Sequence, residues 1–129
     1  MIVGVVASGA GGVEQLRVGL VERLVALGYT VAVTLTPTAG WWLENVGEVG
    51  KLEVVTGLPV RSEPRMPGEP RPHPKADAYA VVPASANTVA KLALGIGDNQ
   101  AMSVLCESVG SVPMVVFPRV NAAHARHPA

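Results

Sequence analysis

Cysteine, aromatic residues and charge are all scarce in this 129-residue chain. The single cysteine, Cys106, excludes an intramolecular disulfide and a cysteine-rich metal cage, and it suits the reducing cytoplasm, where we expect the protein to reside. Ten Lys and Arg residues balance ten Asp and Glu residues, so no net charge attracts nucleic acid or an anionic membrane. Charged residues make up only 16% of the chain, against about 25% in typical domains. We therefore expect part of the surface to be buried between subunits.

Several common sequence signals are also missing. The apolar start at residues 2–7 is interrupted by glycines 9, 11 and 12 before a signal-peptide core can form. The uncharged stretch 24–43 contains four threonines and is not typical of a membrane span. Glu14 stands where a dinucleotide site would have its third glycine, and no acidic residue occurs between Glu22 and Glu44 to hold an adenosine ribose. No P-loop sequence occurs. These absences disfavour NAD and exclude a P-loop hydrolase, so a mononucleotide remains.

The hydrophobic pattern predicts an α/β protein. Apolar runs at 2–7, 30–36, 78–82 and 113–117 indicate buried strands. Apolar residues at helical spacing predict a helix over 13–27 that ends at Gly28. Because a strand, helix, strand unit is right-handed, its two strands are parallel neighbours. We expect a Rossmann-like or flavodoxin-like three-layer fold in one domain, 1–129, and four strands are few enough to suggest that a C-terminal part is missing.

The rest of the chain divides into shorter elements. The sequence indicates helices at 38–46, from 89 to about 96, and at 99–108 with Asp98 as cap, and either a short strand or a helix end at 52–56. Residues 59–74 hold six of the eleven prolines and predict a long loop. Trp41 and Trp42 are candidates either for the core or for covering a ligand or a neighbouring subunit. Cys106 is expected to be a packed thiol.

Four loops follow the four strands, and in a parallel sheet they meet at the carboxyl edge where ligands bind. They are residues 8–12, 36–39, 83–88 and 118–121. The glycine-rich loop at 8–12 precedes a helix, and the free backbone amides at the start of that helix suit a phosphate. Such a loop can also be no more than the turn that connects a strand to a helix. The loop Pro-Ala-Ser-Ala-Asn-Thr at 83–88 offers polar side chains to a planar ring, although Ser85 also fits an ordinary helix cap.

The loop at 83–88, followed by Lys91-Leu92-Ala93, Gly95-Ile96 and Asp98-Asn99, resembles the homo-oligomeric flavin-containing cysteine decarboxylases. This group includes phosphopantothenoylcysteine decarboxylases and the peptidyl-cysteine decarboxylases of lantibiotic synthesis. The resemblance implies an FMN cofactor at a subunit interface in a homotrimer or a dodecamer. It also implies a set of cofactor-binding residues: Ser8, Gly9, Ala10, Thr36, Thr38, Ser85, Ala86, Asn87 and Thr88.

Two segments depart from the family pattern. Similar proteins have a histidine fourteen residues before the proline that matches Pro83, and that position is Glu69 here, so His73 becomes the candidate catalytic base. The family's Pro-Ala-Met-Asn segment corresponds to residues 118–121, where Asn121 is the candidate for holding a substrate carboxylate. Arg119 offers a guanidinium fork to a carboxylate or phosphate. His124 and His127 have no third ligand nearby, so we predict no metal site.

These observations leave three hypotheses. The first is a flavin-dependent decarboxylase that acts on a small or peptide-linked cysteine-type substrate. The second is an FMN-binding protein of the same fold with another redox substrate or a partner-binding role. The third is a prenyl-FMN-forming transferase, which ranks last because that group lacks the Ser-Ala-Asn-Thr loop.

Overall fold

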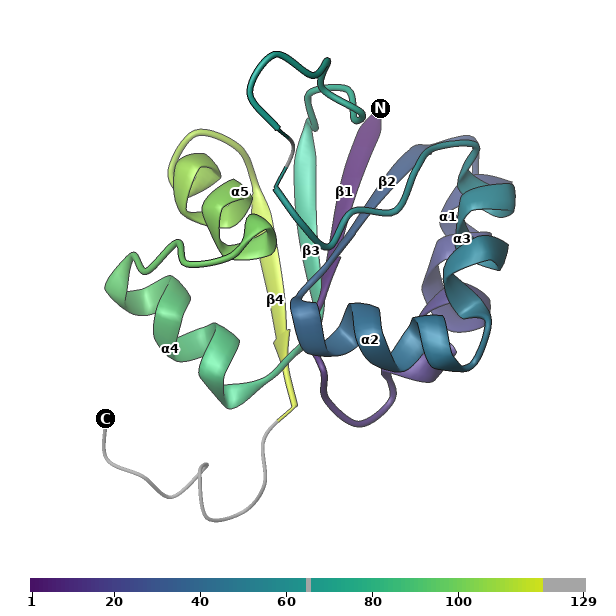
Figure 1. Ribbon diagram of the computed structural model, residues 1–129. Coiled ribbons are helices and arrows are strands. Elements are labelled where there is room, and N and C mark those ends of the chain that lie inside the picture. The colour runs from purple at the N-terminus through teal and green to yellow at the C-terminus, as the bar shows by residue number, and fades with distance from the viewer. Residues whose placement is uncertain (65, 120–129) are drawn as a thin grey trace.

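A four-stranded, fully parallel sheet forms the centre of the computed structural model, which describes residues 1–64 and 66–119 (Figure 1). The strands are β1 (Ile2–Ala7), β2 (Thr30–Leu35), β3 (Ala78–Ala84) and β4 (Met114–Pro118), in the order β2-β1-β3-β4. Val3 of β1 is paired with Val31 on one side and with Ala78 on the other. The predicted α/β class, the four strands and their parallel direction are therefore confirmed.

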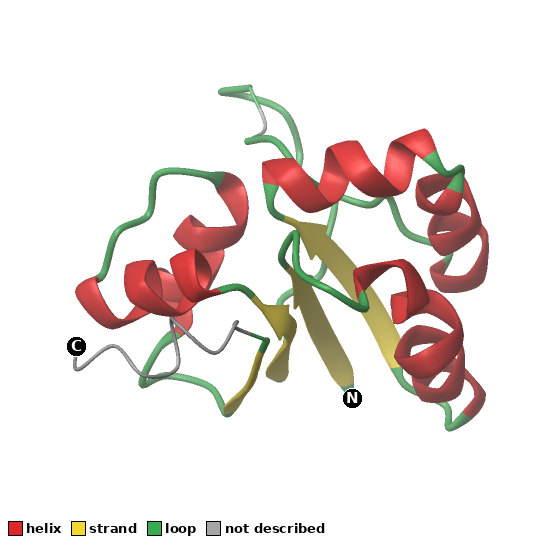
Figure 2. Cartoon of the chain, turned by 90° about the horizontal axis from the view of Figure 1, so that it is seen from below, coloured by secondary structure: helices red, strands yellow, loops and turns green. Residues whose placement is uncertain are grey.

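Helices cover both faces of the sheet, which makes a three-layer arrangement (Figure 2). On one face lie α1 (Glu22–Ala26), α2 (Pro37–Asn45) and α3 (Glu48–Thr56). On the other lie α4 (Ala86–Leu94) and α5 (Gln100–Ser108). Alternate residues of a strand point to opposite faces. Accordingly, Val5 packs with the α1 to α3 layer, and Val6 with the α4 and α5 layer.

The helical segment after β1 is less regular than its leucine spacing predicts. It begins with a 3-10 turn (Val13–Gln15), continues through a π turn (Arg17–Val21) and becomes α-helical only at Glu22. Arg17, in the π turn, forms ion pairs with Glu22 and with Glu48 of α3, which fastens the turn to the neighbouring helix. Gly28 ends the segment with a φ of 95°, as predicted.

The structure corrects two details of the sequence interpretation and decides between alternatives in two others. Asn99, not Asp98, caps α5, because its side chain accepts a hydrogen bond from the Met102 amide at 2.9 Å. The helix predicted to reach residue 96 ends at Leu94, since Gly95 takes a left-handed φ of 72°. Of the two alternatives for residues 52–56, the helix end is confirmed, because they form the last part of α3. Trp41 is 68% exposed and Trp42 is also exposed, so neither is a core residue.

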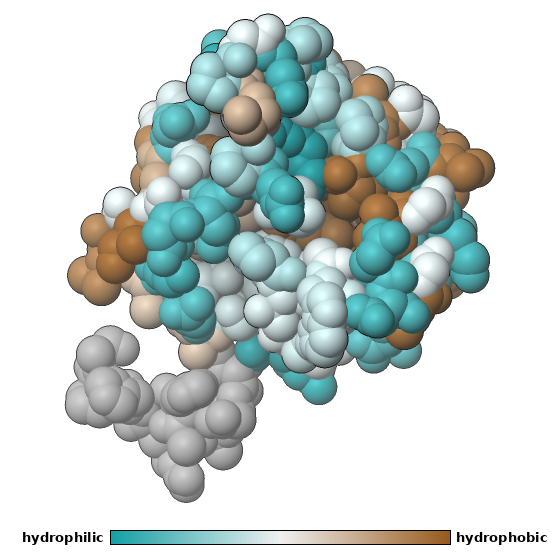
Figure 3. All heavy atoms as spheres, viewed as in Figure 1, coloured by the Kyte–Doolittle hydropathy of each residue, from teal (hydrophilic) through white to brown (hydrophobic). Residues whose placement is uncertain are grey.

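The proline-rich segment forms the predicted loop between α3 and β3. Near its start, Arg61 forms a parallel bridge with Thr34, which adds one paired residue beyond the β2 edge. The loop then crosses the end of the molecule where the strands begin, and in Figure 3 its surface is mainly hydrophilic, with a hollow beneath it. No helix within the described residues is long and apolar enough to cross a membrane.

Candidate functional site

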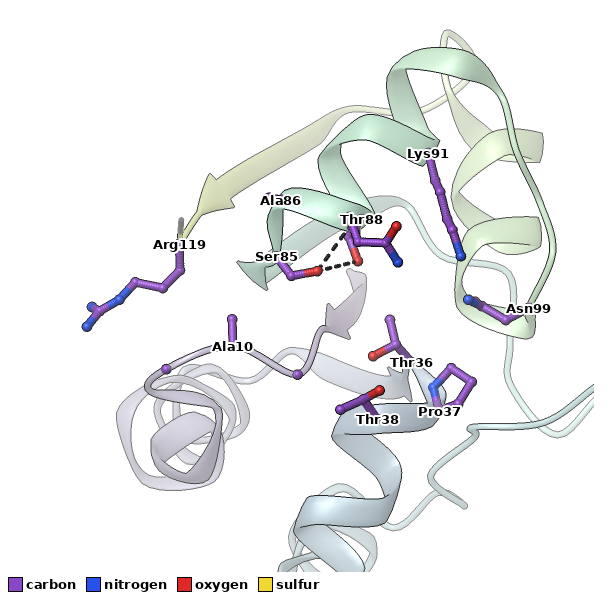
Figure 4. A pocket seen from close by; sticks show the side chains of 13 residues that line it. Ala10, Thr36, Pro37, Thr38, Ser85, Ala86, Thr88, Lys91, Asn99 and Arg119 are labelled. Atoms are coloured by element: carbon purple, nitrogen blue, oxygen red, sulfur yellow. Dashed lines mark hydrogen bonds between the residues drawn. The ribbon is translucent and has the colours of Figure 1, made fainter. Parts of the chain in front are cut away.

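A cleft of about 770 Å³ opens where the strands end, which is the predicted place for a ligand in this fold. The loops after β1, β2 and β3 meet there, together with the end of β4 (Figure 4). Its volume lies within the range of about 300–1,000 Å³ that is usual for small-molecule and cofactor sites. The cleft is lined by Gly9, Ala10, Gly11, Thr36, Pro37, Thr38, Ser85, Ala86, Asn87, Thr88, Lys91, Asn99 and Arg119.

Three hydroxyl groups join the β1 loop to α4 beneath the cleft. Ser8, which is 1% exposed, donates a hydrogen bond from Oγ to Thr88 Oγ1 at 2.7 Å. Ser85 Oγ donates to the same oxygen at 3.2 Å and accepts from the Thr88 amide at 3.2 Å, which caps α4. Because Thr88 Oγ1 accepts both bonds, its own proton is free for a group in the cleft, which Thr88 lines. Ser8 is not a lining residue, so its position is that of a support for Thr88.

The β1 loop and the start of α2 lie unusually close together. A Cβ atom on Gly9 would be 2.5 Å from Thr38 Cγ2, a distance that only the absence of a side chain permits. Thr36 caps α2, and Pro37 occupies the first helical position, where proline is favoured. Two nine-residue helices, α2 and α4, therefore start at the cleft and direct their positive ends toward it.

Cationic side chains lie at opposite ends of the cleft. In Figure 4, Lys91 extends from α4 toward Asn99, whereas Arg119 extends outward beyond the loop that carries Ala10. Lys91 Nζ is paired with the Asp98 carboxylate at 2.8 and 2.9 Å. Arg119 is held through its backbone amide, which donates to the Ala84 carbonyl at 2.8 Å. No acidic residue is among the described residues that line the cleft, so the site suits an anionic group.

The structure separates the candidate base from the cleft. His73 lies in a second groove, on the α5 side of the sheet, and its ring nitrogen is hydrogen-bonded to the Pro59 carbonyl. Burial lowers the pKa of His73, the nearby charge of Arg61 lowers it further, and the bond to Pro59 opposes both effects. Glu69 lies in a turn with Met66, also away from the cleft. Asn121, His124 and His127 lie outside the described residues.

Nine of the predicted site residues do line the cleft: Gly9, Ala10, Thr36, Thr38, Ser85, Ala86, Asn87, Thr88 and Arg119. Two further lining residues, Gly11 and Pro37, belong to the predicted loops at 8–12 and 36–39, whereas Lys91 and Asn99 were not predicted as site residues. Lys91 was detectable, because it follows Thr88 by three residues and so lies on the same side of the helix. Asn99 was not, because only the packing of α5 against α4 brings it to this end of the sheet. Within residues 1–64 and 66–119 no group of three His, Cys, Asp or Glu residues is arranged to hold a metal.

Two helices start at the cleft, Gly9 lets the β1 loop approach α2 closely, and none of the described lining residues is a carboxylate. These features fit a phosphate-bearing cofactor. The Flavoprotein family model matches residues 2–129, which is nearly the whole chain. The chain belongs to the Flavoprotein family. Its cofactor is accordingly a flavin, and the helix starts and hydroxyl groups of the cleft provide donors that suit one. The predicted family resemblance is confirmed.

Individual relatives agree with this assignment. A probable phosphopantothenoylcysteine decarboxylase of Streptococcus mutans is 31% identical over 115 residues, which are 84% of this chain. The match spans 62% of that relative's length. Among solved structures, the FMN-dependent cysteine decarboxylase TvaF from thioviridamide biosynthesis superimposes with a TM-score of 0.77 and 24% identity, over 99% of this chain and 78% of TvaF. HAL3 from Cryptococcus neoformans gives a TM-score of 0.76 and 25% identity, over 99% of this chain and 75% of HAL3.

Proposed function

We propose that the flavin of this protein is FMN and that it occupies the cleft at the ends of the strands. The observation that carries this proposal is that two helices start at the cleft, and that its described lining residues include two cations and no carboxylate. Gly9, Thr36 and Thr38 would hold the phosphate, where the β1 loop approaches α2 most closely. Ser85, Asn87 and the Thr88 hydroxyl would contact the ring. FMN-dependent relatives with the same fold support the choice of this cofactor.

We further propose that the reaction is an oxidative decarboxylation of a small or peptide-linked cysteine-type substrate. Bound FMN would supply a two-electron acceptor. The thiol-bearing side chain would give up two hydrogens, and cleavage of the bond to its carboxyl group would release carbon dioxide and leave an enethiol. The chain's own residues would orient the substrate. Arg119 lines the cleft and its fork-shaped guanidinium suits a substrate carboxylate, a role that we also propose for Asn121.

The lining of the cleft gives specific weight to the second hypothesis, in which the protein binds FMN but serves another redox substrate or a partner. Lys91 and Arg119 are the ionisable side chains among the described lining residues, and Lys91 is already paired with Asp98. Neither is suited to accept a proton from a thiol at neutral pH. His73 lines the second groove and does not line the cleft of its own chain. We therefore propose that any catalytic role of His73 would be at the cleft of a second copy of the chain.

We propose that copies of the chain assemble into a trimer or a dodecamer with the flavin near the interface. Trp41 and Trp42 support this arrangement, because both are exposed on α2, the helix whose first turn lines the cleft. Large exposed aromatic side chains are typical of interaction surfaces. Such an interface would also account for the low content of charged residues.

A spectrum and a mass measurement test these proposals together. The purified protein should be yellow and should release FMN when denatured. It is then incubated without oxygen with a peptide that ends in cysteine. Decarboxylation would bleach the flavin once and lower the peptide mass by carbon dioxide and two hydrogens. A yellow protein that leaves the peptide unchanged would favour the second hypothesis, and a colourless protein that takes up no added FMN would contradict the cofactor assignment.

A further inference from the structure

The second groove has a volume of about 540 Å³ and lies on the α5 side of the sheet, between the strands and the proline-rich loop. Its floor is made of small residues, Gly4, Ala32 and Thr34, although the other face of the same strands carries Val5, Val33 and Leu35. Gly4 is small for a specific reason. A Cβ atom there would be 2.3 Å from Cε1 of Tyr79, whose ring lies against β1 at this point. The groove is therefore built into the sequence of β1 and β2.

The rim of the groove is strongly basic. Arg61, Arg71, His73 and Lys75 line it from the proline-rich loop, whereas Glu107 of α5 is the acidic residue among the described lining residues. Neither Arg71 nor Lys75 makes an ion pair or side-chain hydrogen bond with another residue in the described part of the chain. Their charges are therefore available to a ligand, and the low-dielectric floor beneath them strengthens the attraction to an anion.

The floor also carries a hydroxyl group that is open to a ligand. Thr34 is 5% exposed, and its side chain makes no hydrogen bond to another residue in the described part of the chain. The described residues contain no fully buried side-chain oxygen or nitrogen without a partner, so the Thr34 hydroxyl is not sealed from the groove. Since Thr34 lines the groove, its hydroxyl can donate a hydrogen bond to a molecule inside it. Serines 103, 108 and 111 also line the groove; their protons are donated to backbone carbonyls, which leaves their oxygens as acceptors.

We propose that this second groove binds a small dianion, either a phosphate monoester or a dicarboxylate, at a site separate from the flavin cleft. Arg71 and Lys75 would hold the charged group, and the Thr34 hydroxyl would donate a hydrogen bond to the part that reaches the floor. The volume of the groove is within the usual range for small-molecule sites. The flavin cleft lies beyond the carboxyl ends of the strands and shares no lining residue with the groove, so both sites can be filled together.

The test is an NMR titration of the isotope-labelled protein with its flavin bound, so that the cofactor's own phosphate fills the cleft. Inorganic phosphate is added in one series and malonate in another, with sodium chloride keeping the ionic strength constant. We expect saturable shifts of the amide signals of Thr34, Lys75 and Tyr79. Saturation by both anions indicates a site for dianions in general, and saturation by phosphate alone indicates a phosphate site. Either result supports the proposal.

Variants decide whether the groove itself is responsible. The exposed pair Arg71→Gln and Lys75→Gln should together weaken phosphate binding at least tenfold, and Thr34→Val, which keeps the shape of the side chain, by about fivefold. Arg23→Gln, on the exposed side of α1, is the matched loss of a cation elsewhere and should leave the affinity unchanged. The proposal is overturned by an absence of saturable shifts, by shifts confined to residues 9–12 and 36–39, or by an Arg71 and Lys75 variant that binds as well as the parent.

Discussion

Replacing Thr88 with valine should remove the acceptor that joins the β1 loop to α4 while keeping the shape of the side chain. Thr88 is 3% exposed, and its oxygen accepts from Ser8 and from Ser85. Ser85 is only partly buried and can turn its hydroxyl toward water. Ser8 cannot, so its donor would be left buried without a partner, at a cost of about 1–3 kcal/mol. For a domain of this size the melting temperature should fall by about 4 °C for each kcal/mol.

The companion change tests this reasoning. Ser8→Ala alone removes one hydrogen bond worth about 1 kcal/mol and leaves Thr88 with its bond from Ser85. The double variant lacks the Ser8 hydroxyl, so no buried donor is left without a partner. Its loss of stability should therefore be smaller than the sum of the two single losses by at least about 1 kcal/mol. Urea denaturation of the flavin-free protein measures the free energy of unfolding of all three variants. Thr30→Val, at the exposed start of β2, is the control and should change that free energy little. Strict additivity of the two single changes would refute the buried network.

Four further predictions concern the cofactor, pH and assembly. Asn87→Leu should abolish the yellow colour and leave the melting temperature of the flavin-free protein unchanged, because Asn87 lines the cleft and makes no side-chain hydrogen bond within the described residues; a flavin-loaded variant would contradict this. The lowered pKa of His73 means that the folded state binds fewer protons than the unfolded state, so stability should fall as the pH decreases below about 6.5. His73→Gln should flatten that part of the denaturation profile, and an unchanged slope would count against it. Arg17 lowers the pKa of Glu48, so the stability gained from this pair should be full above 4.5, the usual pKa of the carboxyl group, and lost as the pH falls through the lowered value. Glu48→Gln should therefore destabilise the protein at pH 7 and make no difference in strong acid; a loss that is independent of pH would point to packing. Light scattering of the flavin-loaded protein should give a mass that is a multiple of three chains, and a stable monomer would contradict the assembly.

The sequence alone determined the class of the fold, because its signals are local. Strands that are buried on both faces need continuous β-branched runs such as residues 2–7 and 30–35. Left-handed helix ends need glycine, as at Gly28. The loop at 83–88 was detectable for the same reason, since cap, hydroxyls and amide are neighbours in the chain. Once those loops were assigned to the ends of parallel strands, the sheet itself brought them together at one edge, and most of the cleft followed.

Tertiary structure decided what depends on contacts between distant residues. Asn99 caps α5, whereas the carboxylate of its neighbour Asp98 forms an ion pair with Lys91 of α4. His73 was placed away from the cleft because the proline-rich loop returns to the beginning of β3 before the chain reaches the Pro83 turn. The second groove arose where small residues of two strands lie side by side on one face, opposite Tyr79. Sequence spacing does not record such pairings, because each joins residues whose separation along the chain is unrelated to their separation in space.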